Sequence, residues 1–142
     1  MNLEKITVQA TISADRKKVW NFYTNPDHIT KWNFASDDWK CPSARNDLRI
    51  GGNYFARMEA KDGSFGFDFE AIYTEITTYE RIAYTMGKEA GVGRQADVTF
   101  NDIGNQTGVV VTFDAESQNP IEMQRDGWQA ILNNFKKYVE KA

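Results

Sequence analysis

The chain has 142 residues, and its 17 lysines and arginines against 20 aspartates and glutamates give a formal net charge of -3. That charge disfavours a nucleic-acid partner, because binding to phosphates usually requires a basic face. The composition, 41% hydrophobic and 26% charged, is typical of a globular domain and excludes a disordered, collagen-like or coiled-coil chain. No internal repeat or linker-like stretch interrupts the sequence, so we expect residues 1–142 to form a single domain.

The sequence also bears on the cellular compartment. Its apolar runs are a few residues long, whereas a transmembrane helix needs about 20, so we expect no membrane span. The first residues lack the basic start and apolar stretch of a signal peptide. The one cysteine, Cys41, cannot form an internal disulfide, and the expected location is therefore the cytoplasm.

Few residues in the chain suit a metal or a covalent mechanism. A single cysteine and a single histidine, His28, leave no zinc site of those ligands, and we expect no metal and no cofactor. A Cys–His nucleophile pair has no supporting context. We expect Cys41 to be an ordinary buried or half-buried thiol and His28 to lie on the surface, and we assign no catalytic residue.

The first third of the chain predicts one strand and two short helices. Residues 6–12 alternate apolar and polar side chains, which indicates a half-buried strand. Ser13 is placed to cap the helix that follows, and that helix ends before Pro26. Asn25 can cap a second helix that begins with Pro26 and runs to about Lys31.

The middle of the chain predicts strands joined by turns. Residues 33–52 show no clear pattern, except that Gly51 and Gly52 mark a turn or a close approach of two backbone segments. Strands are predicted over residues 53–60, 65–76 and 81–86, followed by a hairpin of residues 96–100 and 107–115 around residues 101–105.

Residues 65–76 form the clearest of these strands. Alternation puts aromatic and small residues on one face, namely Phe65, Phe67, Phe69, Ala71 and Tyr73. We favour an inward aromatic face, which would suit a planar apolar ligand, whereas an outward one would form an exposed interaction patch. In the opposite register, Asp68 and Glu70 would enter an apolar interior, where desolvation would raise their pKa and favour acid–base chemistry.

The C-terminal segment predicts a long amphipathic helix. Asn119 is a candidate cap, Pro120 would take the first helical position, and Glu122 has a capping-box-like spacing. Apolar side chains then recur every three or four residues, at Trp128, Ile131, Leu132, Phe135, Tyr138 and Val139. The predicted order is therefore one strand, two helices, about six strands and a helix of about 20 residues, roughly 30 Å long. A curved antiparallel sheet with this helix on its concave face accounts for that order.

Several short motifs carry a resemblance that spans residues 6–139. They are Ile12-Ser13-Ala14 before Val19-Trp20, Asn25-Pro26-Asp27 and Trp32, the stretch Asp47-Leu48-Arg49-Ile50-Gly51-Gly52, Phe69 to Ile76 with its final Tyr73-Thr74-Glu75-Ile76, and Gly127-Trp128. In order and spacing the chain resembles the START-like, or SRPBCC, superfamily, and within it the branch named for the activator of the heat-shock-protein-90 ATPase. It departs at Ala71, where family members often have glycine, and we expect only a slight change in strand curvature or cavity shape.

The resemblance implies an α+β helix-grip fold, with a curved antiparallel sheet of about six to seven strands gripping the C-terminal helix and two short helices after the first strand. Members of the superfamily enclose an apolar cavity between sheet and helix. Some bind lipids, sterols, plant hormones or polyketides, some are cyclases or aromatases, some sequester a toxic metabolite, and the eukaryotic Aha-type domains assist a chaperone. Fold membership alone does not choose among these roles.

We expect a cavity ligand to contact aromatic or flexible apolar side chains, namely Met58, Phe67, Phe69, Tyr84, Trp128, Ile131 and Phe135, with Trp32 and Trp39 near the entrance. The alternative for the helix stripe, and for both entrance tryptophans, is packing, because an apolar stripe is core by default. Gly127 costs up to about 1 kcal/mol relative to alanine within a helix, and the close approach of a strand or a ligand would offset that cost.

Three functions remain open from the sequence. The leading hypothesis is non-covalent binding of a small apolar or aromatic molecule such as a lipid or polyketide. The second is a cyclase- or hydrolase-type enzyme that uses Asp68 or Glu70 together with Tyr84, and the orientation of Asp68 discriminates between the two. The third is a chaperone accessory, ranked last because the sequence lacks the additional N-terminal domain of the eukaryotic activators. The oligomeric state stays open.

Overall fold

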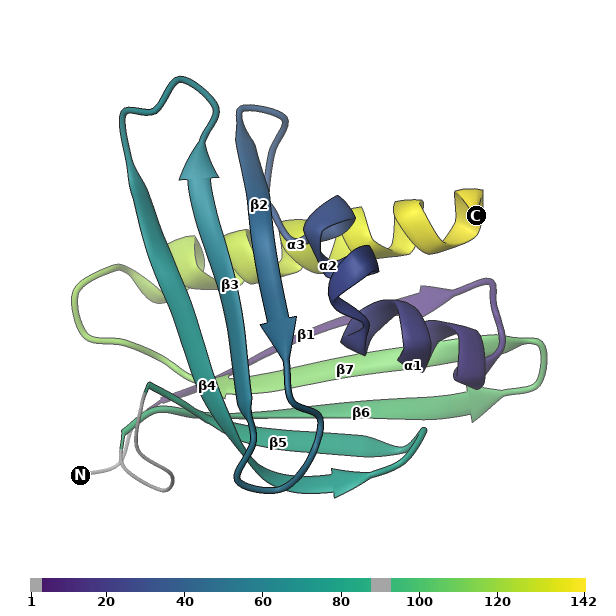
Figure 1. Cartoon of the computed structure of the whole chain (residues 1–142). Coiled ribbons are helices and arrows are strands. Elements are labelled where there is room, and N and C mark those ends of the chain that lie inside the picture. The colour runs from purple at the N-terminus through teal and green to yellow at the C-terminus, as the bar shows by residue number, and fades with distance from the viewer. Residues whose placement is uncertain (1–3, 88–92) are drawn as a thin grey trace.

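The computed structural model describes residues 4–87 and 93–142. Residues 1–3, at the start of the segment in which no signal peptide is expected, lie outside the described residues. Seven antiparallel strands form one sheet in the order β1-β7-β6-β5-β4-β3-β2 (Figure 1). The strands are β1 (Lys5–Ile12), β2 (Trp39–Asn46), β3 (Asn53–Ala60), β4 (Gly66–Thr77), β5 (Arg81–Met86), β6 (Gln95–Ile103) and β7 (Gln106–Asp114). The helices are α1 (Arg16–Thr24), α2 (Pro26–Trp32) and α3 (Ile121–Lys141).

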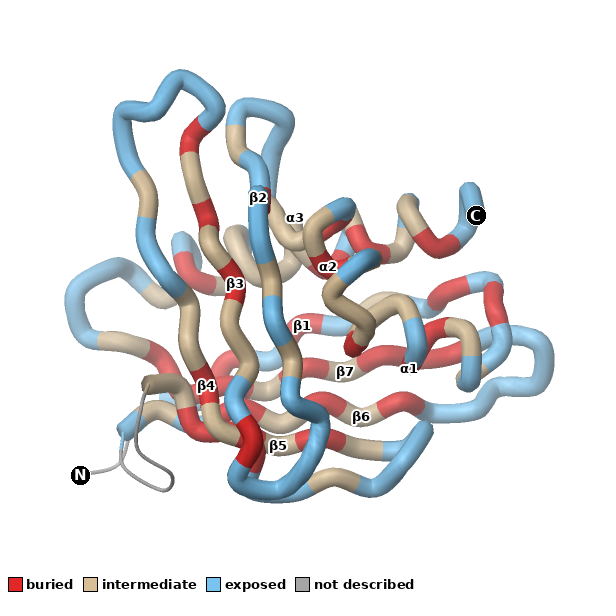
Figure 2. Tube along the Cα trace, viewed as in Figure 1, coloured by how far each residue is buried: buried red, intermediate tan, exposed pale blue. Residues whose placement is uncertain are grey.

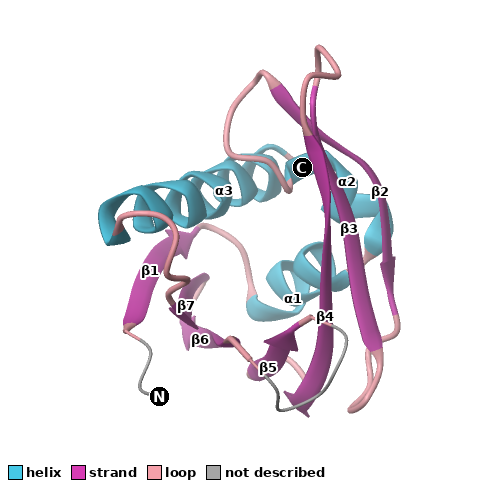
Figure 3. Ribbon diagram, turned by 90° about the vertical axis from the view of Figure 1, so that its left-hand side faces the viewer, coloured by secondary structure: helices cyan, strands magenta, loops and turns pink. Residues whose placement is uncertain are grey.

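The sheet curls around α3, which runs across its open side (Figure 3). Strands β2 to β7 follow one another through turns, and β1 pairs with β7, so the first strand closes the edge opposite β2. Inward residues of β1 are buried, as the alternating pattern predicted, with Ile6 and Ile12 fully covered. The predicted helix-grip fold is thereby confirmed.

The two short helices begin at caps of different kinds. The prediction of Ser13 as the first cap is wrong, because Asp15 is the N-cap of α1 and its side chain accepts from the backbone N–H of Lys18 at 3.0 Å. Asn25 caps α2 as predicted and accepts from the N–H of Asp27 at 2.9 Å. Pro26 then takes the first helical position, where its missing N–H costs nothing.

Strand β2 lies in the segment that showed no sequence pattern. It is an edge strand, and its pairing with β3 shifts between Lys40 and Ser43. Pro42 lies within that irregularity, where a residue without a backbone N–H is tolerated. The shift breaks the two-residue alternation, which explains why the sequence did not indicate a strand here.

Strand β4 begins one residue later than predicted. Phe65 precedes it, in the connection from β3, and its side chain is exposed, so its placement within the strand is wrong. From Phe67 onward the alternation holds, and Ala71 and Tyr73 are buried. The pairing with β5 then shifts between Tyr73 and Glu75.

Helix α3 starts without the predicted cap. Pro120 occupies the N-cap position, and no side chain caps the helix, so the prediction for Asn119 is wrong. The buried amide of Gln124 instead accepts from the N–H of Glu116 and donates to the carbonyl oxygens of Glu116 and Asn119. The expected close approach of a strand to Gly127 is wrong for the described part of the chain, because outside its own helix backbone no described atom lies within 4 Å of where its Cβ would be.

Buried residues extend over the sheet and the inner sides of the helices (Figure 2), and a cluster of aromatic rings packs where α1 and α2 meet α3. Phe135 is fully buried there, and its ring packs edge-on against Tyr23 and Trp32, with centroids 5.1 and 4.7 Å away. Phe100 packs against Tyr23 and Trp20 in the same cluster. The open space beneath α3 borders this cluster and is lined by residues of β1, β3, β4, β5 and β7.

Candidate functional site

A cavity of about 350 Å³ lies between the concave face of the sheet and α3. Its wall draws on both layers of the fold, and its residues are Val8, Tyr23, Trp32, Asn33, Tyr54, Met58, Phe67, Phe69, Tyr73, Ile82, Tyr84, Met86, Arg94, Val111, Glu116, Asn119, Gln124, Trp128, Ile131 and Leu132. Most of them are apolar or aromatic, as in sites that bind small apolar molecules.

Seven of the nine side chains expected at a ligand line this cavity, namely Trp32, Met58, Phe67, Phe69, Tyr84, Trp128 and Ile131. Two do not. Phe135 is fully buried, and the rings of Tyr23 and Trp32 pack against it. It therefore belongs to the packed core, although it lies on the same helix as the wall residues Trp128 and Ile131. Trp39 lies outside the wall and contacts the rings of Phe65 and Phe67 at centroid distances of 5.9 and 6.2 Å.

Trp32 lines the cavity but does not stand at an entrance. It is buried, its indole N–H donates to the carbonyl oxygen of Phe22 at 2.9 Å, and its ring stacks on Tyr23. These contacts fix the ring as part of the inner wall, so the expectation of an entrance position is wrong. The exposed part of the wall instead includes Phe67 on β4 and Asn119 before α3.

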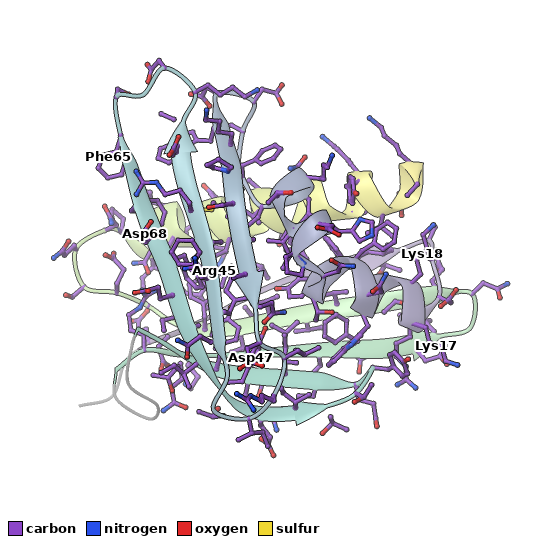
Figure 4. All side chains as sticks on the ribbon, in the orientation of Figure 1. Lys17, Lys18, Arg45, Asp47, Phe65 and Asp68 are labelled. Atoms are coloured by element: carbon purple, nitrogen blue, oxygen red, sulfur yellow. The ribbon has the colours of Figure 1, made fainter. Side chains whose placement is uncertain are left out.

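The register of β4 turns its aromatic face inward. Phe69 lies between the rings of Tyr54 and Tyr84, with edge-on centroid distances of 5.9 and 6.4 Å. Asp68, labelled on β4 in Figure 4, points to the outer face. It pairs with Arg57, whose Nη1 lies 3.1 Å from its Oδ1. Glu70 has the same parity as Asp68 and is not part of the cavity wall. The inward-carboxylate register is therefore wrong, and the enzyme hypothesis loses its best acid.

Four tyrosines converge on the cavity from different elements: Tyr23, Tyr54, Tyr73 and Tyr84. Burial raises the pKa of each hydroxyl above its ordinary value, so all four stay protonated near neutral pH. The hydroxyl of Tyr73 donates to Asn46 at 2.8 Å, and that of Tyr54 accepts from Asn33 at 3.4 Å. Within the described residues, the hydroxyls of Tyr23 and Tyr84 have no hydrogen-bond partner.

The sequence analysis named Tyr84 as a ligand contact but did not predict that Tyr23, Tyr54 and Tyr73 join it at the cavity. Tyr23 comes from a helix, and the others come from three strands. The inward alternation of Tyr73 with Phe67 and Phe69 was a usable signal, whereas the convergence of α1 with β3 depends on the tertiary fold.

The polar part of the wall lies where β6 begins and where the chain enters α3. Arg94 donates from Nε to the carbonyl oxygen of Asp114 at 3.0 Å. Glu116 accepts from the N–H of Asn119 at 2.6 Å, and Gln124 joins both sides of that turn. This region therefore combines one cation, one anion and two amides beside an otherwise apolar space.

The two residues considered for covalent chemistry are structural. Cys41 is buried as expected, and burial raises the pKa of its thiol to about 11, which keeps it protonated and unreactive. His28 is half-buried rather than exposed: its ring stacks on Phe22 at 3.9 Å, and its Nδ1 lies 2.7 Å from the Tyr138 hydroxyl. Neither residue lines the cavity.

Within residues 4–87 and 93–142, no three histidine, cysteine or acidic side chains gather in a way that could hold a metal ion. In the same part of the chain, no helix combines the length and the apolar character needed to cross a membrane.

The curled sheet, the long helix and the cavity between them define a START-like helix-grip domain. Residues 13–140 match the family described as activator of Hsp90 ATPase homolog 1-like protein, and the chain belongs to this family. No match is found among curated proteins.

Solved structures agree with this assignment. An AHSA1-like protein from Aeromonas hydrophila is 41% identical, with a TM-score of 0.88 over 97% of this chain and 93% of its own. A protein from Cytophaga hutchinsonii is 46% identical, with a TM-score of 0.80 over 96% and 92% of the two chains. A protein from Chromobacterium violaceum is 22% identical with a TM-score of 0.84 over 96% and 98%, and this likeness concerns the fold alone.

Proposed function

We propose that this domain binds a small, largely apolar or aromatic molecule, of lipid or polyketide character, in the cavity between the sheet and α3. The observation that carries the proposal is the cavity of about 350 Å³ beside a packed cluster of aromatic rings in the same domain. Protein interiors rarely leave spaces much larger than a water molecule, because an empty space forfeits dispersion contacts. A cavity of this size is therefore best explained by an occupant.

The wall suits such an occupant energetically. Burying roughly 300 Å² of apolar ligand surface would contribute about 7.5 kcal/mol before the cost of immobilising the ligand. Met58 and Met86 lie on opposite sides of β4 and can adapt to different ligand shapes. The rings of Phe67, Phe69 and Trp128 offer faces and edges to a planar molecule.

The free buried thiol of Cys41 is consistent with action in the cytoplasm.

Native and denaturing mass spectrometry of the protein taken from its own host's lysate tests the proposal. We expect a discrete additional mass that is lost on denaturation, and its value would narrow the chemical class. If a chaperone copurifies instead and no small molecule is found, the accessory role takes precedence.

A pair of variants separates cavity binding from surface binding. Val111 lines the cavity on β7, whereas its neighbour Val110 points to the opposite face. Val111→Phe should fill part of the space and reduce the retained ligand at least tenfold, and Val110→Phe should leave it unchanged. Equal retention in both variants, with both folded, would count against a ligand in this cavity.

A further inference from the structure

Arg94 and Tyr84 are brought together by the pairing of β5 with β6. Tyr84 lies opposite Ala96, and the N–H of Met86 donates to the carbonyl oxygen of Arg94 at 2.8 Å. Arg94 is two residues before Ala96, so it and Tyr84 are diagonal neighbours on the same face of the sheet. Both side chains line the cavity. A cation and a phenolic donor therefore stand side by side at its wall.

The hydroxyl of Tyr84 faces the open space. The residue is only 9% exposed, and no described residue hydrogen-bonds to its hydroxyl. Among the described residues, every side-chain oxygen or nitrogen that is fully covered by protein has a partner, so the Tyr84 hydroxyl is not covered by packing. Burial raises its pKa well above the ordinary value, against a smaller opposing influence of the Arg94 charge. It is thus a neutral hydrogen-bond donor for which the described residues offer no acceptor.

The guanidinium of Arg94 is oriented by a backbone acceptor, and its charge is one of the smaller influences that lower the pKa of the Asp114 carboxyl, after the bonds from Lys5 and Gln95. Its Nε donates to the carbonyl oxygen of Asp114, and no carboxylate in the described part of the chain pairs with it as a salt bridge. The carboxylate of Asp114 is already engaged, by Lys5 at 2.6 Å and by the N–H of Gln95 at 2.9 Å. Glu116 also lines the cavity, but its carboxylate accepts from the N–H of Asn119.

We infer that the cavity selects an aromatic or aliphatic carboxylic acid, whose carboxylate binds the terminal amines of Arg94 and accepts from the Tyr84 hydroxyl. This inference rests on the proposed function and names the chemical class of its ligand. The planar fork of a guanidinium matches both oxygens of a carboxylate, and such charge-assisted bonds are stronger than neutral ones. The apolar body of the acid then lies against Phe69, Trp128 and Ile131.

Two matched pairs of probes test the inference by isothermal titration calorimetry: 2-naphthoate against 2-naphthalenemethanol, and decanoate against decanol. We expect the acid of at least one pair to bind the wild-type protein at least tenfold more tightly than its alcohol. Arg94→Gln should remove that preference while the affinity for the alcohol stays unchanged. Tyr84→Phe should lower the affinity for the acid severalfold.

Control variants change the same chemical groups away from the cavity. Arg49→Gln removes a highly exposed guanidinium that pairs with Asp47, and Tyr79→Phe removes a hydroxyl that does not line the wall. Both should bind the probes as the wild type does. Thermal unfolding identifies any variant that does not fold, and the acid-to-alcohol ratio of the wild type stays informative even if Arg94→Gln is unstable.

The outcomes separate this inference from the proposed function. Equal binding of acid and alcohol to the wild type, or a preference that persists in folded Arg94→Gln, overturns the carboxylate assignment and leaves apolar binding in place. Failure of all four probes to bind the wild-type protein counts against the proposed function itself.

Discussion

The indole of Trp128 stacks on the ring of Phe113, with centroids 3.8 Å apart and planes 12° apart, and this contact seats α3 on β7. Phe113 is fully buried beneath it, while Trp128 extends to the cavity wall. One side chain therefore holds the helix to the sheet and also shapes the space beneath the helix.

Replacing Trp128 tests this double role. Trp128→Ala should lower the free energy of unfolding by about 3 kcal/mol, because it removes the stacked ring and leaves a void. Trp128→Phe retains a ring over Phe113 and should cost distinctly less. Urea unfolding followed by circular dichroism measures both, and a loss below about 1 kcal/mol for the alanine variant would contradict the structural role of the stack.

The cap of α1 is a second prediction. Asp15→Ala should destabilise the protein by about 1 kcal/mol, since it removes the acceptor for the N–H of Lys18. Ser13→Ala is the matched control, and it should cost less because the Ser13 hydroxyl does not cap the helix. The reverse order of the two losses in urea unfolding would show that Ser13 is the cap after all.

The buried tyrosines predict how stability depends on pH. Their folded-state pKa values lie above the ordinary value of 10, so above about pH 10 the unfolded chain releases protons that the folded chain retains. The contribution of these groups is complete below that pH, and stability should fall as the pH rises further. Tyr84→Phe should make the fall shallower, which thermal unfolding between pH 8 and pH 11 measures. An unchanged slope would contradict the buried, protonated state of Tyr84.

The outer-face position of Asp68 predicts a small effect. Its ion pair with Arg57 is solvent-exposed, and exposed pairs contribute roughly 0–1 kcal/mol. Asp68→Asn should therefore change stability by less than about 1 kcal/mol and leave the binding of an apolar probe unaltered. A marked loss of binding in this variant would restore a role for the carboxylate at the site.

Much of the fold was predictable because its signals are local. The bounds of β3 and β5 follow from alternation between turn residues, and α2 follows from Asn25 and Pro26. Strand β2 was not predicted because the register shift near Pro42 removes the alternation of side chains on which a strand prediction depends. The cap of α1 was misplaced because Ser13 and Asp15 both lie near the helix start and either side chain can cap, and the path of the chain selects Asp15. The prediction for Asn119 failed because α3 begins after its N-cap residue Pro120 without a side-chain cap.

By itself the sequence determined the order of the elements other than β2, and it favoured the inward aromatic face of β4 and most of the apolar wall, since periodicity records which face of an element avoids water. Only the tertiary structure decided which residues of one apolar stripe are packed and which border open space. Phe135 and Ile131 occupy the same helix, yet one is covered by Tyr23 and Trp32 and the other lines the cavity. Likewise, Arg94 and Tyr84 are neighbours only through the register of β5 against β6, because proximity between strands depends on pairing and not on distance along the chain.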